Sequence, residues 1–300
     1  MKVGMIGLGD IAQKAYLPVL TARSDIDLRI ATRNSRVLQE LGDKYRLKAR
    51  FLDLDSLLQS GIEACFVHTA TQSHYDIVKK LLNRGVHVYV DKPIDNHYER
   101  SAQLMKLAED NRRLLTVGFN RRYVPAYQSM KGRKLDLIVM QKHRKDSPGE
   151  PRSVVFDDFI HIVDTLRFLL PGPITSLQVH SKLENGLLLQ VGVHLSGPGH
   201  AAIGLMHRRS GRNEEVLECM GDGESFKMVN LNDITHYAGM ESRTHPNEWT
   251  PVPAQRGFEQ ICDDFLSRVR AGEQTSSSAG PDLLTHEWCE AIVRQIEEQA

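Results

Sequence analysis

The sequence lacks the features that would place the chain in a membrane or on nucleic acid. It has no apolar run near the roughly 18 residues that span a bilayer, and its start, MKVGMIGLGD, has neither the charged nor the apolar region of a signal peptide. Lys plus Arg and Asp plus Glu number 38 each, which gives a formal net charge of zero. We therefore expect a cytoplasmic protein that binds a small molecule and has no nucleic-acid or membrane partner.

Cysteine is also scarce, and its spacing excludes two further classes of protein. The four cysteines lie far apart without CxxC spacing, so neither a disulfide framework nor a zinc site is indicated, and we expect no metal. The length of 300 residues exceeds that of a usual single domain. We predict one domain over 1–119 and a second over 120–300, in which the last helix is a candidate to pack back on the first domain. A Ser-rich link is expected over 275–280.

A glycine turn near the start organises the first domain. The apolar run Val3–Ile6 predicts a buried strand, and Gly7-Leu8-Gly9-Asp10-Ile11-Ala12 leads from it into a helical segment. The turn needs Gly7, and a pyrophosphate can approach the backbone only if position 9 lacks a side chain. Free N–H groups at the start of the helix would face the phosphates. An ordinary strand-to-helix turn is the alternative.

The end of the second predicted strand, 27–32, indicates which dinucleotide binds. An NAD site commonly has Asp or Glu there for the ribose hydroxyls, whereas a 2′-phosphate needs a cation instead. The residues present are Thr32, Arg33, Asn34, Ser35 and Arg36. A small hydroxyl followed by two arginines suits a phosphate, so we predict NADP, with NAD as the alternative and a solvent-exposed polar loop as the structural explanation.

Strands and helices alternate from residue 2 to about 118, which predicts a doubly wound parallel sheet of the Rossmann type. One strand, 86–90, ends in Asp91-Lys92-Pro93. The proline holds Lys92 in an extended conformation, where its ammonium could stabilise negative charge on a substrate oxygen, although a surface lysine is the structural alternative. Asn120 and Arg121, in the polar cluster where the chain leaves this domain, are further candidates to bind the cofactor.

From Leu135 the pattern changes to one helix and a series of alternating strands, which predicts an α+β domain with an open, mostly antiparallel sheet. The segment 154–169 is helical by period and would bring Asp157, His161 and Asp164 to one face. A carboxylate one turn before a histidine can orient the imidazole for acid–base work. A structural pair is the alternative reading of Asp157 and His161.

These motifs, in this order, resemble those of the Gfo/Idh/MocA oxidoreductases, in particular the MviM-like branch. The resemblance rests on six segments, at 7–12, 69–75, 86–94, 117–125, 157–164 and 256–272. It implies catalytic roles for Lys92, Asp157 and His161 and a homodimer, or higher homo-oligomer, formed through the second sheet. It also implies cofactor contacts at Gly7, Gly9, Asp10, Ile11, Thr69, Ala70, His74, Asp91 and Lys92.

The chain departs from the family pattern at three places. Asp91 replaces a glutamate, Thr71 replaces a proline, and Arg152-Ser153-Val154 stands where a glycine pair normally precedes the second-domain helix. We expect an NAD(P)-dependent oxidoreductase acting on a secondary alcohol or ketone of a sugar, cyclitol or similar polyol. The alternatives are a catalytically silent NADP(H)-binding sensor and an imine- or biliverdin-type reductase.

Overall fold

The computed structural model describes residues 1–275 and 280–299 and divides into two compact units. Unit 1 comprises Met1–Phe119 and Phe258–Leu284, and unit 2 comprises Asn120–Gly257 and Thr285–Ala300. We had predicted two contiguous domains, 1–119 and 120–300. The structure differs, because the segment from Phe258 folds with unit 1 and the chain returns to unit 2 within the last helix. Most of the expected Ser-rich link, 276–279, lies outside the described residues.

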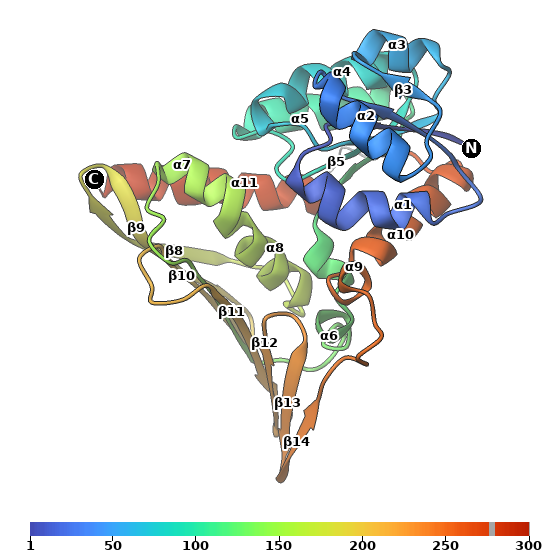
Figure 1. The fold of residues 1–300 in the computed structure, drawn as a ribbon. Helices are drawn as coiled ribbons and strands as arrows, with labels where there is room; N and C mark the ends of the chain where they lie inside the picture. The colour runs from blue at the N-terminus through green and yellow to red at the C-terminus, as the bar shows by residue number, and fades with distance from the viewer. Residues whose placement is uncertain (276–279, 300) are drawn as a thin grey trace. The chain divides into compact units, whose positions relative to one another are not determined.

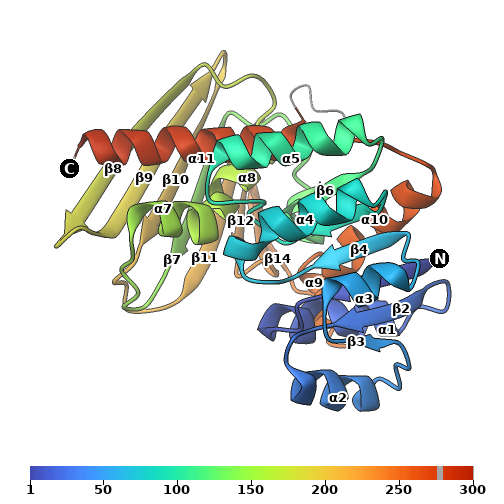
Figure 2. The ribbon, with the colours of Figure 1, turned by 90° about the horizontal axis from the view of Figure 1, so that it is seen from above.

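Unit 1 is a six-stranded parallel sheet with the order β3-β2-β1-β4-β5-β6, which confirms the predicted Rossmann architecture. Helices α1 and α10 cover one face, and α4 and α5 cover the other (Figures 1 and 2). The elements are β1 Lys2–Ile6, η1 Ala12–Tyr16, α1 Leu17–Thr21, β2 Asp27–Ala31, α2 Ser35–Lys44, β3 Arg50–Phe51, α3 Leu54–Gln59, β4 Ala64–Val67, η2 Thr71–Ser73, α4 His74–Asn83, β5 His87–Val90, α5 Tyr98–Asp110, β6 Leu115–Val117 and α10 Phe258–Arg270.

Aromatic packing explains why α10 belongs to unit 1. The ring of Phe265, on this helix, meets Phe66 of β4 edge-on at 5.2 Å and Tyr89 of β5 at 5.6 Å between ring centroids. All three rings are fully buried, so their removal from water stabilises the return of the chain to the first sheet.

Unit 2 is an eight-stranded sheet with the order β14-β13-β12-β11-β7-β10-β9-β8. Every pair is antiparallel except β7 and β10, so the prediction of an open, mostly antiparallel sheet is confirmed. Asn185 and Gly186 both have positive φ, as a two-residue hairpin turn requires. The elements are η3 Asn120–Tyr123, α6 Pro125–Gln128, β7 Leu137–His143, α7 Pro151–Val154, η4 Val155–Phe159, α8 Ile160–Leu169, β8 Ser176–Glu184, β9 Leu187–Gly197, β10 His200–His207, β11 Glu214–Gly221, β12 Glu224–Val229, β13 Asp233–Ala238, β14 Met240–Thr244, α9 Val252–Gln255 and α11 Pro281–Glu298.

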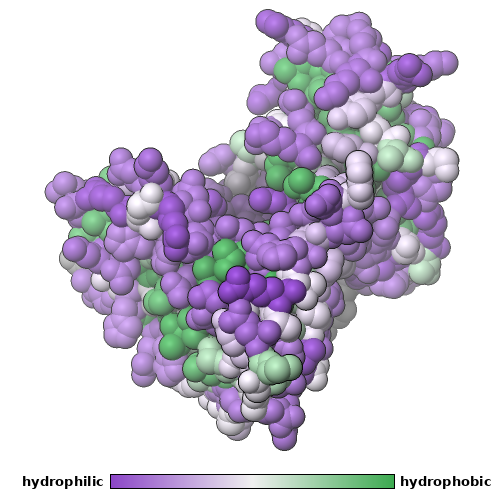
Figure 3. All heavy atoms as spheres, turned by 60° about the horizontal axis from the view of Figure 1, so that its bottom comes forward, coloured by the Kyte–Doolittle hydropathy of each residue, from purple (hydrophilic) through white to green (hydrophobic). Residues whose placement is uncertain are grey.

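A helix covers one face of this sheet, and apolar side chains remain partly exposed on the other. Helix α8 packs on β7 and β10, and the alternate side chains on that face are buried. The opposite face carries half-buried apolar side chains, and hydrophobic groups gather over these strands on the lower left of Figure 3. They include Leu137, Val139, Ile203 and Leu205. No helix among the described residues is long and apolar enough to cross a bilayer.

A buried ion pair fixes α8 within unit 2. The Arg122 guanidinium donates from Nε to both carboxylate oxygens of Asp164, at 3.1 and 3.0 Å, and the Thr285 hydroxyl donates to the same carboxylate at 2.9 Å. Asp164 is 2% exposed. Three segments of the chain therefore meet at one carboxylate, which gives Asp164 a structural role.

Removing this carboxylate should destabilise the fold. Asp164→Ala would leave the Arg122 cation without that partner, and the loss of one member of a buried pair typically costs about 3 kcal/mol. We expect the free energy of unfolding from urea titration to fall by about that amount. Asp110→Ala, in an exposed pair with Lys106 on helix α5, serves as the control and should have little effect. Equal stability of the two variants would contradict the structural role.

Candidate functional site

The glycine turn after β1 is held closely against the end of β4. Gly7 has φ of 89°, and a Cβ there would lie 2.6 Å from the carbonyl oxygen of His68. Its N–H donates to the carbonyl of Ala31 at 3.1 Å, so the turn also contacts the end of β2. A side chain at this position is excluded both by its φ and by the space available. A Cβ at Gly9, in contrast, would meet nothing within 4 Å.

This turn forms one wall of a cavity of about 670 Å³ at the carboxyl ends of the strands of unit 1. Such strand ends are where open α/β sheets bind ligands. Seven of the predicted cofactor-binding residues line the cavity: Gly7, Gly9, Thr32, Arg33, Asn34, Thr69 and Ala70. Asp10, Ile11, Arg36, His74, Asp91 and Lys92 are not among its lining residues.

The two arginines after β2 differ in their surroundings. Arg33 is exposed and lines the cavity, whereas Arg36 pairs through Nε with Glu40 at 2.7 Å, one helical turn away. The Asn34 side chain accepts from the Val37 N–H at 3.1 Å and so caps the start of α2. This cap fixes the start of α2 directly after Arg33. The Arg33 side chain therefore places a cation on the cavity wall.

Several lining residues were not predicted from the sequence, among them Gln13, Leu52, Asp53, His68 and Ile77. Leu52 follows β3 directly and is 52% exposed although it is apolar, which suits a surface for a flat ring. Asp53 accepts from the Ser56 N–H at 2.8 Å and caps α3, and these hydrogen bonds lower the pKa of its carboxyl. We predicted residues 51–53 as a strand, whereas β3 ends at Phe51, so both residues follow the strand and the strand-end rule could have identified them only with the correct boundary.

The cavity fits a dinucleotide in two respects. The open space beside Gly9 lets phosphate oxygens reach the N–H groups of the turn, as the glycine pattern requires. The side chain of His68 is buried, and neither ring nitrogen has a hydrogen-bond partner among the described residues, since its Nδ1 lies 3.8 Å from Asp91. A buried imidazole that makes no hydrogen bond within the described residues, and meets Asp91 only at ion-pair distance, can bond to a polar group of a bound cofactor.

The end of β5 presents the predicted lysine. The Asp91 carboxylate accepts from the Lys92 N–H at 2.8 Å. Burial alone would raise the pKa of the Asp91 carboxyl, but its contacts with His68 and the charge of Lys92 hold that pKa below its usual value. His74 links this loop to the preceding one, because its ring nitrogens lie 2.9 Å from the carbonyls of Pro93 and Thr69. The imidazole therefore holds the loop after β4 against the loop after β5.

In unit 2, the segment expected to be one regular helix contains a π-helical stretch, η4, between α7 and α8. The wider turn breaks the period of 3.6 residues on which the predicted common face of Asp157, His161 and Asp164 depended. Asp157 is exposed, His161 is 8% exposed, and Asp164 is held by Arg122. Such π-helical turns occur frequently at functional sites.

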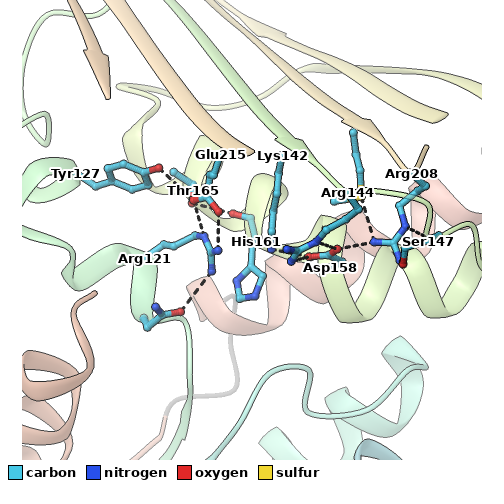
Figure 4. A network of polar contacts seen from close by, with 12 residues as sticks. Arg121, Tyr127, Lys142, Arg144, Ser147, Asp158, His161, Thr165, Arg208 and Glu215 are labelled. Carbon is cyan, nitrogen blue, oxygen red and sulfur yellow. Dashed lines mark hydrogen bonds and ion pairs between the residues drawn. The ribbon is translucent and has the colours of Figure 1, made fainter. Parts of the chain in front are cut away.

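The neighbouring carboxylate, Asp158, is buried and carries contacts that the sequence did not predict. Three cations surround it: Lys142 Nζ at 2.5 Å, Arg144 Nε at 2.7 Å and Arg208 Nη1 at 2.5 Å (Figure 4). Burial would raise the pKa of the Asp158 carboxyl, but the hydrogen bonds from Arg144 and the charge of Lys142 hold it far below its usual value. We call Lys142, Arg144 and Arg208 the basic cluster.

Arg121 and Asn120 also lie in unit 2. The Arg121 guanidinium donates to both carboxylate oxygens of Glu215, at 2.8 and 2.6 Å, and Glu215 also accepts from the Tyr127 hydroxyl at 3.1 Å. The Asn120 amide donates to the carbonyl of Arg256 at 2.9 Å. These contacts give both residues a structural role beside their predicted one at the cofactor.

Two family models match the chain. Residues 1–119 match the Gfo/Idh/MocA model, described as an oxidoreductase family with an NAD-binding Rossmann fold. Residues 125–238 match a YceM-like C-terminal domain. Each matched range falls within one of the two units.

Similar proteins agree with this result. YceM of Salmonella typhimurium is 33% identical over 98% of this chain and 97% of its own. The crystal structure of the dehydrogenase MviM from Clostridium difficile has a TM-score of 0.91 and 31% identity, over 98% of this chain and 99% of that one. Inositol 2-dehydrogenase of Rhizobium meliloti is 26% identical over 100% of this chain and 98% of its own. The glycine turn, the strand-end cavity and these matches together show that the chain belongs to the Gfo/Idh/MocA oxidoreductase family, in its MviM-like branch.

Proposed function

We propose that this protein is an NADP-linked oxidoreductase that converts a secondary alcohol of a sugar, cyclitol or related polyol to the ketone, or the reverse. The observation that carries the proposal is the strand-end cavity, in which an exposed arginine stands where an NAD site commonly has a carboxylate. The similarity to an inositol dehydrogenase supports a polyol as the substrate. An NAD-linked reaction is the alternative.

The proposed chemistry uses three side chains. When bound, the cofactor supplies the hydride acceptor at C4 of its nicotinamide ring. His161 takes the hydroxyl proton of the substrate as the carbon loses its hydride, and returns the proton in the reverse direction. Asp157 orients His161, and the Lys92 ammonium stabilises negative charge on the substrate oxygen. The products of oxidation are the ketone, the reduced cofactor and one proton.

Different residues would hold different parts of the cofactor. The turn at Gly7, Gly9, Asp10 and Ile11 would receive the pyrophosphate, with its N–H groups as donors. Thr32, Arg33 and Asn34 would bind the 2′-phosphate, to which Arg36 adds its charge from one turn away. Thr69, Ala70, His74, Asp91, Lys92, Asn120 and Arg121 complete the proposed set.

A homodimer is proposed through the open face of the second sheet. The half-buried Val139, Ile203 and Leu205 lie on neighbouring strands of that face and form an apolar surface. A second copy of the chain would remove this surface from water. We also propose a cytoplasmic location, since all four cysteines are free and buried, as reducing conditions allow.

Replacing the proposed base should reduce turnover rather than cofactor binding. For His161→Asn we expect kcat to fall by about 10²- to 10⁴-fold, because proton transfer loses its acceptor. NADPH absorbance over a panel of sugars and polyols measures kcat, and fluorescence titration shows whether the cofactor still binds. Wild-type kcat in this variant would remove His161 from the mechanism. Tight NADPH binding without turnover on any substrate would favour the silent sensor.

The two arginines after β2 provide a matched test of cofactor choice. Arg33→Gln should weaken NADPH binding by about 10- to 100-fold and leave NADH binding nearly unchanged, because only NADPH carries the 2′-phosphate. Arg36→Gln should have a smaller effect, since Arg36 already pairs with Glu40. Fluorescence titration measures the dissociation constants of NADPH and NADH for each variant. Equal losses for NADPH and NADH in the Arg33 variant would contradict NADP preference.

A charge on the open sheet face should prevent dimer formation. Leu205→Arg places a cation in the proposed interface, where it would be desolvated without a partner. We expect the molar mass in sedimentation equilibrium to fall to that of one chain, with an unchanged circular-dichroism spectrum. The exposed substitution Lys134→Ala is the control. A variant that keeps the wild-type mass would place the interface elsewhere.

A further inference from the structure

The basic cluster is assembled by the register of three neighbouring strands. β7 and β10 run parallel, so Arg144 and Arg208 follow their carboxyl ends on the same side of the sheet, while Lys142 lies one residue before the end of β7. β11 runs antiparallel to β7 and pairs Glu215 with Lys142. Lys142 lies on the same face of β7 as Ile138 and Met140, and α8 covers that face.

The cluster and its neighbours carry more positive than negative charge. The basic cluster and Arg121 provide four cations, and Asp158 and Glu215 provide two carboxylates, so two positive charges are in excess when Lys142 is protonated. The three cations of the cluster all contact Asp158, and burial together with repulsion from Arg121 lowers the pKa of Lys142 to about 7. Excess charge in a poorly hydrated region is unfavourable unless a counter-charge is supplied.

The cluster also has hydrogen-bond donors left over. A lysine ammonium has three donors, and Asp158 is the one partner that Lys142 has among the described residues. Arg144 uses Nε and Nη2 for Asp158, while its Nη1 has no partner in the described part of the chain. The Lys142 side chain is only 4% exposed, so water cannot readily satisfy it. The buried Lys142 ammonium therefore has donors to spare for a further acceptor, and the Nη1 of the partly exposed Arg144 is open to the same group.

The position of the cluster connects it with the proposed reaction. Asp158 and His161 lie three residues apart on the continuous segment of η4 and α8, so one helical turn separates the cluster from the proposed base. Figure 4 shows the His161 ring on the same side of the sheet as the cations. The Arg144 side chain is 36% exposed, which leaves the cluster open to a ligand.

We propose that the basic cluster binds an oxyanion of the substrate, a carboxylate or a phosphate ester, so that the substrate of this enzyme is an acidic polyol derivative rather than a neutral sugar. The inference rests on the proposed function and adds the chemical class of its substrate. Arg144 offers a planar guanidinium with a donor to spare, and Lys142 offers a compact charge. Asp158 holds the cations together before the substrate arrives.

Binding of matched probes tests this proposal without requiring turnover. D-Glucose, D-glucuronate and D-glucose 6-phosphate share one skeleton and differ in whether they carry no anion, a carboxylate or a phosphate. Isothermal titration of the NADP-loaded protein should show at least one anionic member binding about 10-fold or more tightly than D-glucose. The better of the two anions identifies the group that the cluster accepts.

Two variants assign the effect to the cluster. Arg144→Gln and Lys142→Met should each weaken binding of the preferred anion by about 10- to 100-fold. Arg209→Gln is the matched control, because Arg209 is adjacent to Arg208 in sequence but pairs with Glu184 at 2.7 Å. Its anion affinity should equal that of the wild type. Circular dichroism and melting temperature establish that each variant folds.

The outcomes separate this inference from the proposed function. Anion affinities equal to that of D-glucose would overturn the inference, even if NADPH-dependent turnover of neutral polyols supports the enzyme. Variants with lowered melting temperature but wild-type anion affinity would also overturn it, because the cluster would then be a structural network. Anion binding without turnover on any acidic polyol would retain the anion site but contradict the oxidoreductase function on which the substrate assignment rests.

Discussion

The close approach of the first turn to the end of β4 is the constraint on which the nucleotide cavity depends. The backbone at Gly7 lies so near the carbonyl of His68 that no side chain fits, and the same turn donates to Ala31 at the end of β2. Three strand ends are thereby held at one edge of the sheet, and the residues that follow each of them line one cavity. The cofactor binding proposed for the glycine turn and for Arg33 depends on this arrangement of strand ends.

Much of unit 1 could be predicted because its signals are local. β1, β4 and β5 are continuous apolar runs between turns, as strands buried on both faces must be, and their order along the chain dictates a parallel sheet. The strand-end rule then located Thr32 and Arg33. The return of α10 to this unit was not predicted, because it depends on contacts of Phe265 with the rings of Phe66 and Tyr89, which lie far earlier in the sequence.

Unit 2 was predicted less completely, and the reasons are physical. A helical period of 3.6 assumes uniform turns, so it could not anticipate η4, within which Asp158 rather than Asp157 is the buried carboxylate. β13 and β14 were missed, since their half-exposed and exposed side chains give no alternating apolar pattern. Lys142 did leave a signal, because strict alternation in β7 places it on the face of Ile138 and Met140.

A net charge of zero conceals the feature that distinguishes the second unit. The balance of 38 cations and 38 anions constrains only the sum over the chain, whereas recognition depends on where strand register gathers the charges. Lys142 alone on a buried face would be unfavourable, and Asp158 offsets part of that penalty while also binding two arginines. A network built only for stability would be expected to match its charges, as Arg122 and Asp164 do. The unmatched cations beside His161 are therefore better explained by a charge that arrives with the substrate.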